Sequence, residues 1–226
     1  MHKINYLANN WLALKINNRT VKKKSKKFKG TVYDFGCGER PYESYILKIA
    51  DKYIGVDWNE TLHDLNADII ADLNKPLPIE SEIAETVTSF QVLEHLHDPQ
   101  MMLNEAYRIL KKDGNIVLTV PFQWWVHEAP YDYFRYTIYG LKHIFKKAGF
   151  REINITPASG FFSTWILKMN YFSARFIKGP FFIRLLIRMT MTPLWYLGQL
   201  LAPILDRLDN DPSLETIGYI VVAKKK

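Results

Sequence analysis

The chain has 226 residues, of which 48% are hydrophobic and 23% charged, a balance typical of a globular protein and not of a disordered or fibrous one. Its single cysteine, Cys37, excludes an intramolecular disulfide framework and favours a cytosolic setting. The net charge of +7 is unevenly distributed, with +9 in residues 1–30, −7 in residues 31–159 and +5 in residues 160–208. We therefore expect the surface that faces polyanions to lie apart from an acidic central domain.

The N-terminal segment predicts an amphipathic helix over residues 4–16, because Ile4, Leu7, Trp11 and Leu14 follow helical spacing. A lysine run at residues 22–29 follows it. Two interpretations of this run remain: a solvated linker, or a segment that contacts an anionic surface.

From Thr31 onward, predicted strands alternate with predicted helices. The strands are expected at 31–35, 53–57, 67–71, 86–90, 115–120, 151–156 and 217–223, and the helices at 42–50, 99–110 and 138–148. This alternation predicts right-handed βαβ units, and hence an α/β fold with a mostly parallel sheet covered on both faces. Ligands of such sheets bind beyond the carboxyl ends of the strands.

The strongest chemical signal follows the first strand, in the segment Asp34-Phe35-Gly36-Cys37-Gly38. Glycines at such a turn let the backbone approach a ligand that side chains would displace. A dinucleotide fingerprint would need glycine at position 41, where Pro41 stands, so NAD and FAD are disfavoured. Asp57 ends the next strand, where a carboxylate can accept hydrogen bonds from both hydroxyls of a ribose.

Ordered motifs make the chain similar to the class I S-adenosylmethionine (SAM)-dependent methyltransferases, specifically the small-molecule group called methyltransferase type 11. The motifs are Val32 to Gly38, Gly55-Val56-Asp57, Ala71-Asp72-Leu73, Gln91 to Leu96 with Asp98-Pro99, Leu110 to Pro121, and Ala148-Gly149-Phe150. The resemblance implies a Rossmann-like, seven-stranded, mostly parallel sheet whose last strand is antiparallel. It also implies that the cofactor is S-adenosyl-L-methionine.

The same resemblance implies roles for individual residues. Gly36 and Gly38 would pack against the methionine part of SAM, Asp57 would bind the ribose, Asp72 and Leu73 would flank the adenine, and Gln91 would lie near the methionine end. The predicted cofactor-binding residues are Asp34, Gly36, Cys37, Gly38, Asp57, Trp58, Asp72, Leu73 and Gln91. Many relatives have a glycine where this chain has Arg40.

The loop after the fifth strand holds the candidate catalytic groups. Methyl transfer is an in-line displacement, so an enzyme must align the acceptor and exclude water, and an alcohol or phenol acceptor must also lose a proton. We predict His127 as the general base, with Asp132 and Arg135 orienting the substrate. An ion pair between Asp132 and Arg135 that braces the loop is the alternative.

No metal is predicted. Glu94 and His95 match a hydrogen-bonded structural pair of the similar family, and the spacing of His95 and His97 is not supported by further ligands nearby. Cys37 is expected to be a small residue that fits the cofactor loop, although a helix N-terminus can lower the pKa of a thiol.

About sixty residues rich in aromatic and basic side chains separate the last two predicted strands. A single membrane crossing is disfavoured, because it would place two strands of one sheet on opposite sides of the bilayer. A cap or homodimer face, and a helical hairpin lying on an anionic membrane surface, remain open. The hairpin would break at Thr192-Pro193. The predicted organisation is a basic arm (1–30), a methyltransferase domain (31–159 and 209–226) and a helical insert (160–208).

These features predict a SAM-dependent methyltransferase that acts at a membrane surface on a small-molecule or lipid-linked acceptor, for example by O-methylation of a glycan or quinone-like ring. We expect it in the cytoplasm, peripheral to the inner face of the membrane. An RNA methyltransferase is an alternative supported by the lysine arm alone, and the acidic central domain argues against nucleic acid. A non-catalytic, membrane-associated scaffold is a further alternative. The acceptor lies in variable loops that the sequence does not fix.

Overall fold

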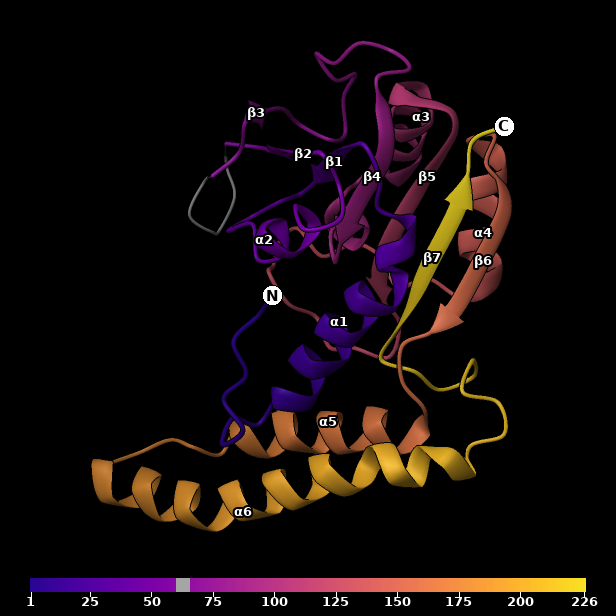
Figure 1. Ribbon diagram of the computed structural model, residues 1–226. Coiled ribbons are helices and arrows are strands. Elements are labelled where there is room, and N and C mark those ends of the chain that lie inside the picture. Colours follow the sequence, from indigo (N-terminus) through magenta and orange to yellow (C-terminus); the bar gives the residue numbers. More distant parts are fainter. Residues whose placement is uncertain (60–65) are drawn as a thin grey trace.

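The computed structural model describes residues 1–59 and 66–226. Within them, a seven-stranded sheet in the order β3-β2-β1-β4-β5-β7-β6 forms the centre of the molecule (Figure 1). β7 runs antiparallel to both of its neighbours, and the other neighbouring strands are parallel. The strands are β1 (Thr31–Phe35), β2 (Lys52–Asp57), β3 (Ile69–Ile70), β4 (Ala84–Phe90), β5 (Leu110–Pro121), β6 (Arg151–Pro157) and β7 (Gly218–Lys224). The predicted Rossmann-like sheet with an antiparallel last strand is confirmed.

Helices cover both faces of this sheet. They are α1 (Trp11–Lys24), α2 (Glu43–Ile46), α3 (Pro99–Ile109), α4 (Ile138–Lys147), α5 (Phe161–Ala174) and α6 (Phe181–Leu205). Val21 of α1 and Ile46 of α2 are buried in one cluster with Val222 of β7. Leu103 of α3 and Phe145 of α4 are buried in another cluster on the sheet.

The starts of α3 and α4 are encoded locally. The side chain of Asp98 accepts a hydrogen bond from the Met101 N–H over 3.1 Å, and Pro99 occupies the first turn of α3. Thr137 caps α4 in the same way by accepting the Gly140 N–H over 3.1 Å. Both boundaries fall where the sequence predicts them because the capping residues are local signals.

The N-terminal helix lies further along the chain than the predicted range of 4–16. α1 begins at Trp11 and takes up part of the lysine run, and a short 3-10 helix over Ser25–Lys27 follows it. Leu7 is exposed, whereas Val21 is buried, so the buried stripe starts and ends later than the spacing suggests. Lysines are good helix formers and are favourable at a helix C-terminus, which explains why the run is helical.

Three other predicted boundaries are also wrong. α6 continues through Thr192-Pro193 without a break and contains Pro203 as well. A proline inside a helix removes one backbone hydrogen bond and costs about 3 kcal/mol, but Trp195 and Gln199 are buried beyond it and hold the helix together. The helix expected at 42–50 is reduced to α2, and the strand expected at 67–71 is reduced to β3.

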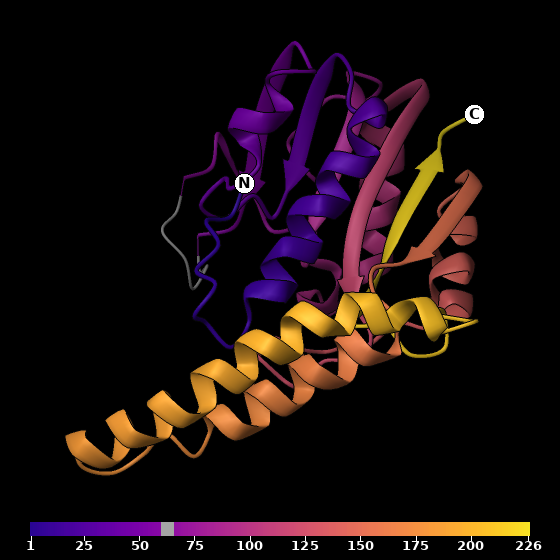
Figure 2. The same ribbon diagram turned by 60° about the horizontal axis from the view of Figure 1, so that its bottom comes forward.

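α5 and α6 lie side by side as a helical hairpin, called here the α5–α6 hairpin (residues 161–205), which projects beyond the sheet (Figures 1 and 2). Its base packs against α1 through a buried cluster that includes Trp11, Leu12, Leu167 and Ala202. No helix among the described residues is both long enough and apolar enough to cross a bilayer.

Candidate cofactor and active site

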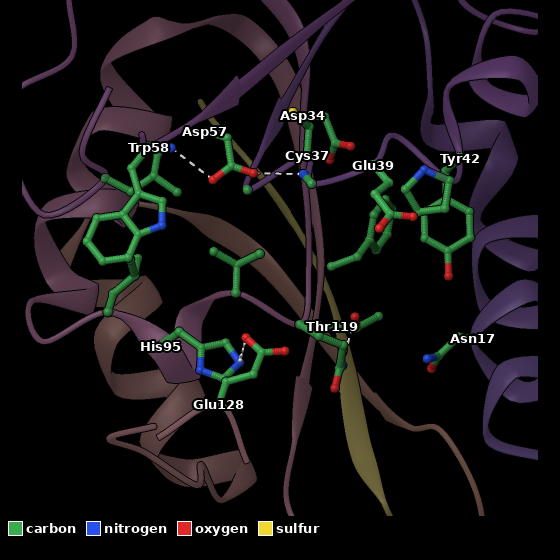
Figure 3. A pocket seen from close by; sticks show the side chains of 18 of the residues that line it. Asn17, Asp34, Cys37, Glu39, Tyr42, Asp57, Trp58, His95, Thr119 and Glu128 are labelled. Carbon is green, nitrogen blue, oxygen red and sulfur yellow. Dashed lines mark hydrogen bonds and ion pairs between the residues drawn. The ribbon is translucent and has the colours of Figure 1, made fainter. Parts of the chain in front are cut away.

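A cavity of about 460 Å³ opens at the carboxyl ends of β1, β2, β4 and β5 (Figure 3). This volume lies in the usual range for small-molecule and cofactor sites. All nine residues predicted to bind the cofactor line it: Asp34, Gly36, Cys37, Gly38, Asp57, Trp58, Asp72, Leu73 and Gln91.

The turn after β1 needs its two glycines for different reasons. Gly36 has φ +71°, its N–H donates to the Val56 carbonyl over 2.8 Å, and a Cβ there would lie 2.3 Å from Val92 Cγ2. Gly38 has φ +49°, and a Cβ there would meet nothing within 4 Å. Gly36 is therefore required for packing, and Gly38 leaves open the space in which a ligand would lie.

Asp57 is held in place at the end of β2. Its Oδ2 accepts the Gly38 N–H over 2.7 Å, and its Oδ1 accepts the Trp58 N–H over 2.9 Å (Figure 3). Each carboxylate oxygen keeps a further lone pair, so the group can still accept two ribose hydroxyls. The open space at Gly38 and this oriented carboxylate together fit the nucleoside and amino-acid parts of SAM.

Asp34 lies beneath the same turn and is almost fully buried. It accepts hydrogen bonds from the Tyr53 hydroxyl over 2.5 Å and from Thr88 Oγ1 over 2.7 Å. Burial raises the pKa of Asp34 to about 6, although the two hydrogen bonds oppose the shift. Asp34 therefore ties three strands together beneath the cofactor turn.

Cys37 and Arg40 complete the turn. Burial, with Asp34 and Asp57 nearby, raises the pKa of the Cys37 thiol to about 12, so Cys37 is a neutral packing residue and not an activated nucleophile. Arg40 has φ +54°, a left-handed conformation that favours glycine. An ion pair with Asp68 anchors its side chain.

The far wall of the cavity comes from the segments after β3, β4 and β5. Gln91 donates from Nε2 to Thr119 Oγ1 over 3.0 Å. The rings of Trp58 and Tyr131 meet edge to face, with centroids 5.2 Å apart. Asp72 accepts the Asn74 N–H over 2.9 Å.

The three predicted catalytic residues lie behind the cavity wall. Asp132 and Arg135 form a two-pronged ion pair with N–O distances of 2.6 and 2.7 Å, and Asp132 also accepts the His127 N–H over 2.8 Å. These bonds outweigh burial and lower the pKa of Asp132 to about 2. The loop residues that line the cavity are Glu128 and Tyr131.

His127 and His95 meet edge to face, with ring centroids 4.9 Å apart. Burial, together with His95, lowers the pKa of His127, which is therefore neutral at pH 7. Glu94 beside them is fully buried, and burial raises its pKa to about 8.

Several cavity residues were not predicted from the sequence. His2, Leu14, Asn17 and Val21 come from the N-terminal segment, and Thr119 comes from β5. Helical spacing shows that α1 has an apolar face, but it does not show where that face packs. Sequence alone therefore could not place α1 against the cavity.

The sheet order, the glycine turn and the oriented Asp57 define a class I SAM-dependent methyltransferase fold. A family model for methyltransferase domains matches residues 10–155, more than half of the chain. The chain belongs to this methyltransferase domain family, for which SAM is the cofactor.

Curated relatives are similar over part of the chain. A protein of Mycolicibacterium smegmatis described as a probable SAM-dependent methyltransferase is 31% identical over 96 residues, which cover 40% of this chain and 37% of that protein. Two proteins of Mycobacterium tuberculosis with the same description are 28% identical over 96 residues, which cover 35% of each. The match thus spans little more than a third of the length of these relatives.

Solved structures share the fold over nearly the whole chain. A SAM-dependent methyltransferase from Archaeoglobus fulgidus gives a TM-score of 0.59 at 18% identity and covers 95% of this chain and 94% of that one. Phosphoethanolamine N-methyltransferase 2 of Haemonchus contortus in complex with SAM gives a TM-score of 0.57 at 16% identity. The match covers 97% of this chain and 56% of that one. At these identities the likeness concerns the fold.

Proposed function

We propose that the chain transfers the methyl group of SAM to a small, lipid-linked acceptor at an anionic membrane surface, which the α5–α6 hairpin contacts. The observation that carries this proposal is the first half of α6, where large apolar side chains are exposed around the helix. Phe181, Phe182, Leu186 and Met189 are 62%, 80%, 64% and 66% exposed. Apolar surface of this extent is typical of an interaction site and not of a monomer in water.

The charge of the hairpin favours an anionic surface. Arg175, Lys178, Arg184 and Arg188 are all exposed, and residues 160–205 contain no Asp or Glu. Each basic residue near an anionic membrane contributes about 1 kcal/mol to binding. Apolar burial and basic attraction together supply the two signals that stable peripheral binding usually needs.

The hairpin is connected to the cavity through the loop after β5. The rings of Trp125 and Tyr171 are in contact, with centroids 3.5 Å apart. Lys168 Nζ of α5 donates to Gln123 Oε1 over 2.8 Å. Glu128 of the same loop lines the cavity, so an acceptor anchored in the membrane beside the hairpin would lie near the cofactor.

SAM, when bound, supplies a methyl group on a sulfonium that is open to in-line attack. On the protein side, Asp57 and the turn at Gly38 would hold the nucleoside part, and Gln91 would face the methionine end. His127, neutral at pH 7, is the proposed proton acceptor for a hydroxyl on the acceptor. The hydrogen bond from the His127 backbone N–H to Asp132 Oδ2 fixes the position of His127 in the loop.

Flotation with lipid vesicles tests the membrane contact. The full chain should float with vesicles of phosphatidylcholine containing phosphatidylglycerol, and salt or removal of the anionic lipid should weaken binding. Phe182→Asp combined with Met189→Asp should abolish flotation. A matched control places the same charges on exposed apolar residues elsewhere, Tyr139→Asp with Leu214→Asp, and should float normally.

Two results would overturn the membrane contact. One is that the full chain stays in solution with anionic vesicles. The other is that sedimentation shows a homodimer that the hairpin variant dissolves, which would make the apolar face a dimer interface. Methyl labelling of a cell extract, with the label traced to lipid, glycan or RNA, tests the acceptor class separately.

A further inference from the structure

We infer that Glu94, His95 and His127 form a binding site for a divalent transition-metal ion beside the cofactor cavity. Each residue offers one ligand atom, and the three atoms lie within 4.8 Å of one another. Bonds from such an ion to nitrogen or oxygen are about 2.0–2.2 Å long, so two ligand atoms of one ion lie at most about 4.4 Å apart. Small side-chain rotations are enough to close the site around an ion.

Glu94 gives independent support for a cation. Its side chain is fully buried, and neither carboxylate oxygen has a hydrogen-bond partner within the described part of the chain. A buried carboxylate without a hydrogen-bond partner is costly, and such groups are normally paired or bound to a metal. The backbone of Glu94 is anchored, because its carbonyl accepts the Tyr133 N–H over 2.9 Å. The side-chain oxygens thus remain available to bind an ion.

His95 presents the correct nitrogen to an ion. Its Nδ1 lies 2.8 Å from the carbonyl oxygen of Tyr131, and a carbonyl can only accept, so Nδ1 carries the proton. The lone pair is therefore on Nε2, which lies 3.7 Å from Glu94 Oε1. A ring nitrogen held by a backbone carbonyl is the usual support for a metal-binding histidine.

His127 is supported in a similar way by the Asp132–Arg135 pair. Its Nδ1 lies 3.3 Å from Asp132 Oδ2 and 3.3 Å from the Trp125 carbonyl oxygen. Arg135 Nη2 is 3.4 Å from the same nitrogen but donates bonds of 2.7 Å to each of those two oxygens. This arrangement places the proton on Nδ1 and leaves Nε2 free to bind. Asp132 and Arg135 are then positioning residues for His127.

The proposed site borders the cofactor cavity through His95. His95 and Glu128 both line the cavity, and their side chains point toward one another in Figure 3, with Glu128 Oε2 3.6 Å from His95 Nε2. An ion with three protein ligands keeps a further position open, as catalytic zinc sites do. In a step that rests on the proposed function, a hydroxyl of the methyl acceptor would take that position and be held near the cofactor. With the ion bound, His127 would act as a metal ligand and not as the proton acceptor.

The ligand set selects the class of ion. Two imidazoles with one carboxylate suit Zn²⁺, Co²⁺, Fe²⁺ or Mn²⁺, whereas Mg²⁺ and Ca²⁺ prefer oxygen ligands throughout. His97, two residues along, is exposed and lies outside the group. The pairing that the sequence brings to attention, His95 with His97, is therefore not the one that the fold brings together.

Titration with Co²⁺ tests the site, because its visible absorption reports the ligands around it. The full chain, freed of metal by a chelator and dialysed, should bind one Co²⁺ that Zn²⁺ displaces and Mg²⁺ does not. Glu94→Gln and His127→Ala should each weaken binding at least tenfold, and Asp132→Asn should weaken it about tenfold. His97→Ala is the matched control and should bind like the unchanged chain.

SAM affinity by calorimetry and thermal denaturation confirm that each variant is folded. If Glu94→Gln does not fold, His127→Ala decides the result, because His127 lies in a loop near the surface. No Co²⁺ binding by the unchanged chain, or equal binding by all variants, overturns the inference. Because the experiment measures metal binding alone, its result tests this inference independently of the proposed methyl transfer.

Discussion

Gly38 and Asp57 join the ends of two neighbouring strands through a single hydrogen bond of 2.7 Å from the Gly38 N–H to Asp57 Oδ2. The Trp58 N–H holds the other oxygen at 2.9 Å. The carboxylate is therefore oriented before any ligand arrives, and such preorganisation reduces the entropy lost on binding.

The Asp57 carboxylate should account for much of the affinity for SAM. Asp57→Asn should weaken binding by about tenfold to a hundredfold, since a hydrogen bond to a charged group contributes about 1.5–3 kcal/mol. Isothermal calorimetry measures the change. Asp51→Asn, an exposed carboxylate at the other end of β2, is the control and should leave affinity unchanged. Equal affinity for Asp57→Asn and the control would contradict the assignment.

Alanine at the two turn glycines should impair different properties, stability at Gly36 and SAM binding at Gly38. Gly36→Ala places a Cβ 2.3 Å from Val92 Cγ2 at a positive φ, so we expect about 1–3 kcal/mol of lost stability in denaturant unfolding. Gly38→Ala has open space around its Cβ, so it should fold with a smaller loss but bind SAM poorly. Similar stability and affinity for the two variants would show that their roles are not distinct.

Asp34 should make the stability of the protein depend on pH. Its pKa of about 6 in the folded state lies above the ordinary value of 3.8, so the folded state binds the proton more tightly between these values. The free energy of unfolding should therefore fall as pH rises from about 4 to about 6, by roughly 3 kcal/mol from this group. Denaturant unfolding at a series of pH values measures the slope.

Asp34→Asn provides the comparison for that measurement. Its side chain does not titrate, so the difference in stability between the unchanged chain and the variant should vary over this pH window and be constant above it. A constant difference from pH 4 to pH 7 would show that Asp34 is ionised in the folded state throughout.

Gln199 should be the main polar link between α6 and the N-terminal segment. It is fully buried, accepts the Leu12 N–H over 2.9 Å and donates to the Ala8 carbonyl over 3.1 Å. Gln199→Leu leaves these backbone groups unpaired and should cost about 1–3 kcal/mol in thermal or denaturant unfolding. Leu200→Ala, at the half-exposed neighbouring position, should cost much less.

The sheet and the cofactor turn could be predicted because their signals are local. The glycines at 36 and 38 lie in the turn after one strand, and the carboxylate at 57 ends the next. Parallel strands bring those ends to one edge of the sheet. The structure also explains the departure at Arg40, whose positive φ is the conformation that a glycine would adopt without strain.

The remaining parts depend on tertiary packing and could not be predicted. Pro193 is a strong helix-breaking signal, yet α6 passes through it because buried residues beyond it, such as Gln199, hold the helix. Glu94 and His127 lie 33 positions apart, and only the pairing of β4 with β5 brings the loops after these strands together.

α1 contacts both functional regions of the molecule. Leu14 and Asn17 line the cofactor cavity, while Trp11 and Leu12 are buried against the α5–α6 hairpin. A change that orders this helix would affect both the cofactor cavity and the hairpin. Thermodynamic linkage makes such a coupling between the two sites reciprocal. Under the proposed membrane contact, a bilayer that orders the hairpin would therefore raise the affinity for SAM, and bound SAM would in turn slow release from the bilayer. Methyl transfer would then be confined to the membrane that holds the proposed acceptor.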